Sequence, residues 1–138
     1  MNRKNTIPTI DVCEFGTVGD GVTTDTAAIQ AAIDSCAGCG GGTVSLGPGT
    51  YLAGTVRLKD NVTLHLEAGA TLLGSTDLND YPVIRPARRS FTDHYVDRSL
   101  IYAEGAANIA ITGRGVIDGQ GAAFRRPPAA ESKEACLR

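Results

Sequence analysis

The most reactive side chains in this sequence are two cysteines in the stretch CAGC, at positions 36 and 39. CxxC spacing is typical of zinc sites and of redox-active thiols. A zinc site needs about four ligands, and neither a second CxxC nor a histidine pair follows. A redox CxxC gains its low thiol pKa at the N-terminus of a helix, whereas this one falls at a predicted helix end. We therefore interpret Cys36 and Cys39 as small buried residues at a helix cap, and we expect no metal and no other cofactor.

The glycine-rich stretch GTVGDG (16–21) is a second candidate, because glycine-rich loops can cradle phosphate groups. It lacks the Lys-Ser/Thr ending of one phosphate-binding motif and the GxGxxG spacing of another. We interpret it as a turn in which Gly19 and Gly21 adopt positive φ angles.

The two histidines, His65 and His94, are candidates for acid–base chemistry, because imidazole titrates near neutral pH. His65 alternates with Leu64 and Leu66, which predicts a strand residue that faces solvent. His94 lies in a stretch (75–97) that contains two prolines and no strand alternation, so we interpret this stretch as an inserted loop.

The charge of the chain limits its partners. The net charge is −2, which argues against a dedicated nucleic-acid-binding protein. Residues 1–84 carry 4 basic and 9 acidic side chains, and residues 85–138 carry 9 basic and 6 acidic ones. The densest basic stretch is either a contact for an acidic sugar or solvated surface, and it consists of Arg85, Arg88, Arg89 and Arg98.

No apolar run reaches the roughly 18 residues of a membrane span, so we expect no membrane partner. The beginning, MNRKNTIPTIDV, has basic residues but no apolar core of a signal peptide. The expected location is cytoplasmic unless an export signal lies outside this chain.

The elements that must position these residues begin with a short strand, predicted at 9–15, and a helix, predicted at about 25–37. Thr24 or Asp25 is the expected N-cap, and Gly38 or Gly40 the expected stop. The apolar positions have helical spacing, which indicates an amphipathic helix that covers an apolar surface. They are Ala28, Ile29, Ala32, Ile33 and Cys36.

From Gly42 onward the apolar residues alternate and the pattern repeats. GTVSLGPGTYLAG (42–54) aligns with VTLHLEAGATLLG (62–74) at an offset of 20 residues. The aligned pairs are Val44 with Leu64, Leu46 with Leu66, Gly49 with Gly69, Leu52 with Leu72, and Gly54 with Gly74. A third copy, at 108–121, aligns at an offset of 45, which places Ile109 and Ile111 on Leu64 and Leu66; one extra residue before the glycine places Gly115 on Gly69.

Read alone, NVTLHLEAGATLLGS (61–75) could be a hairpin, but its repetition makes it one rung of a stack. The spacing of leucine-rich repeats is absent, and a propeller blade needs about 40 residues. Two similar stretches, 54–61 and 98–108, end in Asn61 and Asn108, which suit a sharp turn. We therefore predict an all-β fold, a right-handed parallel β-helix whose first coils are capped by the amphipathic helix.

These residues resemble a known family. FGTVGDGVTTDTAAIQAAIDSC, GGGTVSLGPGTYLAGTVRLKDNVTLHLEAGATLLGS and SLIYAEGAANIAITGRGVIDGQG are similar to the N-terminal portion of glycoside hydrolase family 28, the polygalacturonases and rhamnogalacturonan hydrolases. The resemblance covers about residues 9–126. It implies hydrolysis of an acidic plant polysaccharide, pectin, by an inverting mechanism in which one carboxylic acid protonates the leaving oxygen and a carboxylate activates water.

The chemical motifs that the family carries are absent from this sequence. The family uses an NTD-like motif, an Asp-Asp pair, a histidine in GHG and a basic pair in RIK, and neither the Asp-Asp pair nor GHG occurs here. Asp77 ends STD, but it precedes most of the coils. Arg57 and Lys59 in RLK imitate RIK, yet they come too early and should point outward while Leu58 points inward. Asp118, in IDGQG, is expected at a structural turn.

We therefore assign no catalytic and no metal-binding residues, and the substrate-binding residues remain undetermined. The predicted organisation is a cap with opening coils at 1–126, a loop insertion at 75–97, and a polar, disordered tail at 127–138. Three functions stay open. They are an inactive N-terminal part of a pectin hydrolase, a non-catalytic carbohydrate-binding or tailspike-like β-helix module, and a lyase or epimerase, which would need clustered carboxylates that we do not find.

Overall fold

The structure is a computed structural model that describes residues 8–84 and 98–124. The predicted tail (127–138) and most of the predicted loop insertion (85–97) lie outside the described residues. His94 and three arginines of the basic stretch, Arg85, Arg88 and Arg89, lie outside them as well.

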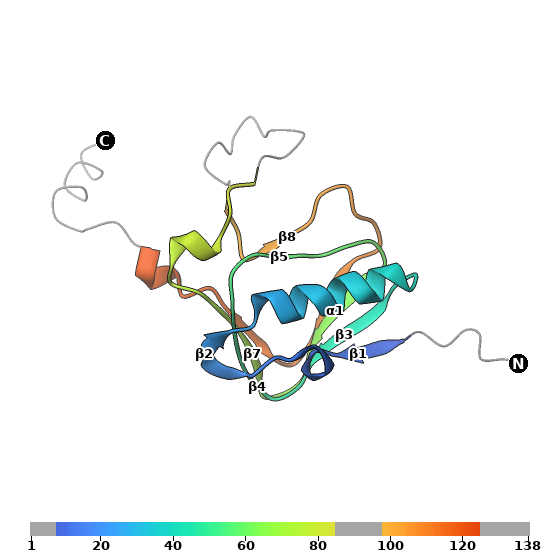
Figure 1. The fold of residues 1–138 in the computed structure, drawn as a ribbon, viewed down its shortest axis with the longest axis horizontal. Coiled ribbons are helices and arrows are strands. Elements are labelled where there is room, and N and C mark those ends of the chain that lie inside the picture. The colour runs from blue at the N-terminus through green and yellow to red at the C-terminus, as the bar shows by residue number, and fades with distance from the viewer. Residues whose placement is uncertain (1–7, 85–97, 125–138) are drawn as a thin grey trace, which may run out of the picture.

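Parallel strands form three sheets, which make the sides of a stack of coils (Figure 1). The first sheet has the order β1 (Thr9–Asp11), β3 (Gly42–Leu46), β6 (Val62–Leu66) and β9 (Ala110–Gly113). The second has the order β2 (Asp20–Thr24), β4 (Gly49–Ala53), β7 (Ala70–Gly74) and β10 (Val116–Asp118). The third pairs β5 (Val56–Arg57) with β8 (Ile101–Tyr102).

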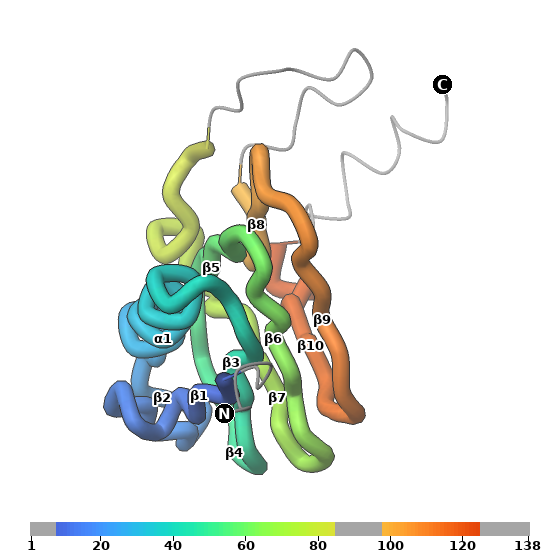
Figure 2. The backbone as a smooth tube through the Cα atoms, turned by 90° about the vertical axis from the view of Figure 1, so that its right-hand side faces the viewer, coloured from blue at the N-terminus to red at the C-terminus, as the bar shows by residue number. Residues whose placement is uncertain are grey.

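Each passage of the chain through the sheets makes one coil, and Figure 2 shows the coils side by side. The strands β3, β4 and β5 form one coil, β6, β7 and β8 form the next, and β9 and β10 begin a third. Every pairing between coils is parallel. The predicted fold, a right-handed parallel β-helix, is confirmed.

Aliphatic side chains fill the interior of the coils. Because side chains alternate between the two faces of a strand, every second residue points inward. The predicted core positions Val62, Leu64, Leu66 and Leu72 are all at most 2% exposed, which confirms them.

The predicted offset of 20 residues between the first two coils is correct for strand β3 and wrong for strand β4. Strand β3 pairs with β6 at the predicted offset of 20, so Val44 lies beside Leu64. Strand β4 pairs with β7 at an offset of 21, so Tyr51, not Leu52, lies beside Leu72. Tyr51 is buried and Leu52 is only half-buried. The prediction was wrong because it aligned the glycines of the two copies. Glycine is common at corners, and its position there does not determine the register of the adjacent strand.

The predicted offset of the third coil is also wrong in its first strand. Ile111 pairs with Leu64 at an offset of 47 instead of the predicted 45, whereas Ile117 pairs with Leu72 at an offset of 45. The corner after β9 is therefore two residues shorter than the corner after β6. Close backbone approach requires glycine there, since a Cβ at Gly113 would lie 2.0 Å from the carbonyl oxygen of Leu66.

The helix α1 (Thr26–Gly38) lies along the coils and covers one end of their interior (Figures 1 and 2). Its buried residues match the predicted stripe except for Ala28, which is half-buried: Ile29, Ala32, Ile33 and Cys36. Asp25 is the N-cap residue, and Gly40 follows the C-cap with φ +97°, as predicted for a helix stop. The helix therefore caps the first coils, as predicted.

The first predicted strand, 9–15, is too long. It ends at Asp11, whose carboxylate accepts a hydrogen bond from the backbone N–H of Cys13 and starts a 3-10 helix, Val12–Phe15. Strand β2 was not predicted, because its sequence, DGVTT, lacks apolar alternation.

The two predicted asparagine turns are confirmed. Asn61 and Asn108 have φ angles of +64° and +59°, a conformation that asparagine tolerates better than most residues. The side-chain amide of Asn108 also donates to the Asn61 side-chain oxygen over 3.0 Å, which joins successive coils. Among the described residues, no helix has the length and apolar character needed to span a membrane.

Candidate functional site: a groove beside the capping helix

Among the described residues, the structure has an open groove of about 920 Å³. It lies between the helix α1, strand β5 with the residues after it, and the stretch 102–106. Roughly 300–1,000 Å³ is the usual size of small-molecule sites in proteins. Its most informative polar side chains come from Gln30, Asp34, Arg57, Lys59 and Tyr102.

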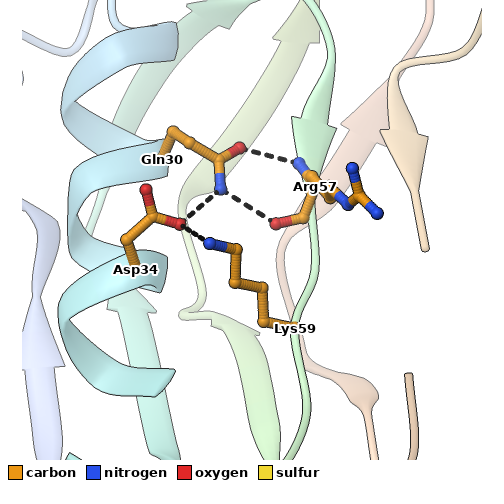
Figure 3. A network of polar contacts seen from close by, with 4 residues as sticks. All are labelled: Gln30, Asp34, Arg57 and Lys59. Atoms are coloured by element: carbon orange, nitrogen blue, oxygen red, sulfur yellow. Dashed lines mark hydrogen bonds and ion pairs between the residues drawn. The ribbon is translucent and has the colours of Figure 1, made fainter. Parts of the chain in front are cut away.

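A glutamine of the helix holds the groove wall in place (Figure 3). The Gln30 amide donates to the backbone oxygen of Arg57 over 3.0 Å and accepts from the backbone N–H of Arg57 over 2.8 Å. Strand β5 pairs with β8 on one side only, so its other edge has unpaired backbone groups. Gln30 therefore serves in place of a neighbouring strand and fixes the backbone from which Arg57 projects.

Lys59 is paired with the helix. Its ammonium nitrogen lies 2.8 Å from a carboxylate oxygen of Asp34, which also accepts a hydrogen bond from Gln30 (Figure 3). The hydrogen bond from Lys59 lowers the pKa of Asp34. Both side chains are nearly half exposed, so this ion pair contributes at most about 1 kcal/mol to stability.

Arg57 is held differently, by an aromatic ring. Its guanidinium carbon lies 5.3 Å from the centre of the Tyr102 ring, a cation–π arrangement. The Tyr102 hydroxyl donates a hydrogen bond to Glu104, and this bond raises the pKa of Tyr102. Within residues 8–84 and 98–124, the Arg57 side chain has no hydrogen bond or ion pair besides this ring contact.

Sequence reasoning placed the basic pair correctly but did not find the groove. Arg57 is exposed while Leu58 is buried, as the alternation predicts. Tyr102 was missed because 45 residues separate it from Arg57, and only the strand register brings the two together. The similarity of 54–61 to 98–108 was the available signal, since it aligns strand β5 with strand β8.

A second, smaller hollow of about 290 Å³ lies where the chain leaves strand β7. Asp77 is near it, but its carboxylate accepts from the backbone N–H of Asn79 and so begins a short helical turn. Beneath it, the Tyr81 hydroxyl donates to the backbone oxygen of Ser75 over 2.6 Å, and the Tyr81 ring meets Phe124 edge-on. Asp77 therefore has a local structural role here.

The remaining polar candidates also have local structural partners. A ring nitrogen of His65 lies 2.8 Å from the Thr112 hydroxyl on the outer face of the first sheet. Asp118 accepts from the backbone N–H of Gln120, which agrees with the predicted turn. These residues are not brought together with the groove.

The cysteines and the glycine-rich turn do not form a site either. Cys36 is fully buried as predicted, and burial raises the pKa of its thiol. The prediction is wrong for Cys39, which is exposed because it lies at the C-cap, beyond the buried stripe of the helix. In the part of the chain that the structure describes, no group of three or more His, Cys, Asp or Glu side chains is arranged to hold a metal ion. The backbone N–H groups of Val18 and Gly19, in GTVGDG, donate to the carboxylate of Asp25.

The stacked parallel coils and the helix that caps them define a class, the parallel β-helix proteins. A sequence profile described as rhamnogalacturonase A/epimerase, pectate lyase-like, matches residues 9–128. The chain belongs to this pectate-lyase-like family.

Individual relatives agree with this assignment. An exo-poly-alpha-D-galacturonosidase from Dickeya chrysanthemi is 35% identical over 136 residues, which cover 87% of this chain and 22% of the relative. The family 28 exopolygalacturonase of Yersinia enterocolitica is 40% identical with a TM-score of 0.70, over 83% of this chain and 21% of that one. An exopolygalacturonase from Thermotoga maritima is 33% identical with a TM-score of 0.73, over 83% and 26%.

The resemblance to glycoside hydrolase family 28 is therefore confirmed. The chain spans about a fifth to a quarter of the length of these relatives.

Proposed function

We propose that this chain forms the helix cap and opening coils of a pectin-degrading glycoside hydrolase of the polygalacturonase type. The observation that carries the proposal is the match to exopolygalacturonases at 33–40% identity together with a coil stack of the same fold. Its substrate is an acidic plant polysaccharide rich in galacturonic acid. The alternative, a non-catalytic β-helix module, is not better supported.

In this proposal the chain supplies scaffold rather than catalytic groups. An inverting glycosidase needs two carboxyl groups about 6.5–9.5 Å apart across the scissile bond. Asp77 and Asp118 hold turns, and the Asp-Asp and GHG motifs that the family resemblance implies are absent from the sequence. The 138-residue chain alone should not hydrolyse polygalacturonate.

A segment exchange tests the proposal. The matched segment of the Dickeya exo-poly-alpha-D-galacturonosidase is replaced by residues 9–124 of this chain, and reducing ends released from polygalacturonate are measured. The hybrid should hydrolyse the polymer, while the 138-residue chain should not. Circular dichroism establishes that each protein is folded.

Two results would contradict the proposal. The first is a folded hybrid without activity, because the opening coils would then not be interchangeable. The second is hydrolysis by the 138-residue chain itself, because it would show that the catalytic groups lie within this sequence.

A further inference from the structure

The end of the helix α1 carries two cysteines in opposite surroundings. Cys36 is fully buried in the core, whereas Cys39, at the C-cap, is exposed. Residues three apart in a helix lie on the same side, with Cβ atoms about 5–6 Å apart. A disulfide needs about 3.5–4.5 Å between its Cβ atoms, so a local shift of about 1–2 Å allows the two sulfur atoms to bond.

The two thiols also differ in how they can react. Burial is the main cause that raises the pKa of the Cys36 thiol, and a negative charge on the neighbouring Cys39 raises it further. Cys36 is therefore a protonated thiol shielded from solvent, whereas Cys39 is accessible to reagents. In thiol–disulfide exchange the accessible sulfur reacts first, and a second thiol nearby then displaces the adduct.

The backbone that follows Cys39 suits a local shift, because it consists of glycines. Gly40 and Gly41 have φ angles of +97° and +111°, and glycine has access to more backbone conformations than any other residue. The end of the helix can therefore rearrange without a side chain that opposes it.

This segment is packed directly against a corner of the coils. The backbone N–H of Gly41 donates to the Cys36 carbonyl oxygen, and that of Gly42 donates to the Asn61 carbonyl oxygen, both over 3.0 Å. A Cβ at Gly41 would lie 2.5 Å from the Asn61 carbonyl oxygen, and a Cβ at Gly42 would lie 3.3 Å from the Cys36 sulfur. A movement of the Cys36 sulfur is therefore transmitted to the corner at Asn61, which precedes β6.

We propose that Cys36 and Cys39 form a reversible thiol–disulfide switch that loosens the end of the capping helix when it is oxidised. The disulfide draws the Cys36 sulfur out of the core, and the cavity that it leaves weakens the packing of α1 against β3. The reduced state is the better packed one, so the disulfide is readily reduced again. The switch acts on the cap and involves no sugar, so it is independent of the proposed function.

The oxidant is a small-molecule disulfide, for which glutathione disulfide serves as the probe. Cys39 loses its proton to water, and its sulfur attacks one sulfur of the probe, which breaks the probe's S–S bond and releases one glutathione. The Cys36 thiol then loses its proton, and its sulfur attacks the Cys39 sulfur and releases the second glutathione. The two cysteines are oxidised together, and one glutathione disulfide is reduced to two glutathione molecules.

The test uses the 138-residue chain with Cys13→Ser and Cys136→Ser, which leaves Cys36 and Cys39 as its two cysteines. Intact mass spectrometry follows the chain in buffers with a rising ratio of oxidised to reduced glutathione. The chain should lose two hydrogens and keep no glutathione, and excess reduced glutathione should restore it.

The oxidised chain should unfold at a temperature about 5 °C lower than the reduced chain, because a buried sulfur has left its packed position. The NMR signals of the Gly41 and Asn61 backbone amides should shift on oxidation. The signal of Val22, in the strand before the other end of the helix, should not.

Two serine variants in this background separate the roles of the sulfur atoms. Cys36→Ser should keep one glutathione bound to Cys39, because no second sulfur is present to displace it. Cys39→Ser is the matched control, with the same atoms exchanged, and it should not react because its remaining sulfur is buried. Circular dichroism establishes that both variants are folded.

Three results would overturn the proposal. The first is a lasting glutathione adduct on the chain that keeps both cysteines, because Cys36 would then not reach Cys39. The second is reaction of Cys39→Ser as fast as that of the pair. The third is an oxidised chain that unfolds at the temperature of the reduced chain or above it, because the disulfide would then not loosen the cap.

Discussion

At the scale of single residues, Asp25 shows why a glycine-rich turn need not bind phosphate. Successive backbone N–H groups in such a turn form a concave site that attracts anions. Here the Asp25 carboxylate accepts from Val18 and Gly19 over 2.9 and 3.0 Å, and Asp25 is only 2% exposed. The expected helix-capping bond from its side chain is absent because the carboxylate is engaged in the turn. The protein thus supplies its own anion.

This arrangement predicts a large effect of Asp25→Ala. Two part-buried hydrogen bonds to a carboxylate would be lost, and a hydrogen bond to a charged group contributes about 1.5–3 kcal/mol, so we expect a loss of about 2–4 kcal/mol in the free energy of unfolding. Urea denaturation measures it. Asp20→Ala is the control, since Asp20 accepts several hydrogen bonds in the same region but is exposed, and it should lose clearly less. Equal losses would show that burial of the carboxylate does not matter.

Tyr102 gives a prediction about pH. Because its hydroxyl donates to Glu104, the folded-state pKa of Tyr102 lies above the ordinary value of about 10. The stabilisation from this bond is fully present below the unfolded pKa and is lost as the pH rises through the folded pKa.

The variant Glu104→Gln should lower the pKa of Tyr102 toward its ordinary value, because it removes a negative charge from beside the hydroxyl. NMR of isotope-labelled tyrosine rings over an alkaline titration measures this. Tyr81 is the internal control, since burial is the main cause that raises its pKa, and its titration should not change. An unchanged pKa of Tyr102 in the variant would contradict the assigned cause.

At the scale of elements, the alternation of apolar residues predicted which segments are strands better than it predicted how those strands pair between coils. Alternation identified the inward residues of β3 and β6 correctly, because one face of each strand must be buried. The offsets of β4 and β9 were wrong because the corners before and after them differ in length. Corner length leaves no periodic trace in the sequence, and glycines recur at corners of any length.

The candidate groove was less predictable than the fold. Local alternation oriented Arg57 outward, but the contact with Tyr102 and the support from Gln30 depend on how a helix and two distant strands are placed. Neither residue carries a motif, so only the weak similarity of two short stretches pointed to the pairing of β5 with β8.

The observed register predicts that two leucines which align in sequence, Leu52 and Leu72, contribute unequally to the free energy of unfolding. Leu72 is fully buried and Leu52 is half-buried. Leu72→Ala should lower the free energy of unfolding by about 2–5 kcal/mol, the range for a buried leucine, and Leu52→Ala should lower it clearly less. Chemical denaturation of the two variants measures the difference. Equal losses would favour the original alignment at an offset of 20.

At the scale of the whole molecule, the described residues leave one end of the coil stack covered and the other end open. The helix α1 covers the first coils, while no strand among the described residues pairs with the free edges of β9 and β10. Ile111 and Ile117, which continue the inward rows of Leu64 and Leu72, are 45% and 43% exposed. Unpaired strand edges beside apolar side chains promote association.

We therefore predict that the 138-residue chain self-associates with increasing concentration, which sedimentation velocity measures. Ile117→Lys should weaken the association because it places a charge in the inward row. Val116→Lys is the matched control, since Val116 pairs with Thr71 in an outward row, and it should have a smaller effect. A chain that stays monomeric at all concentrations would show that the open end is covered.

The corners between the first and second sheets differ in length from coil to coil, but the strands that they connect still pair in register. From the first sheet to the second, the step from Leu46 to Thr50 is four residues, that from Leu66 to Thr71 is five, and that from Gly113 to Val116 is three. Neighbouring coils nevertheless keep their parallel strand pairing in both sheets. Loops at the corners can therefore gain or lose residues through insertion or deletion, while equivalent residues in successive coils stay about 4.8 Å apart. The stack thus fixes the distance between the points at which successive loops begin, whatever the length of each loop.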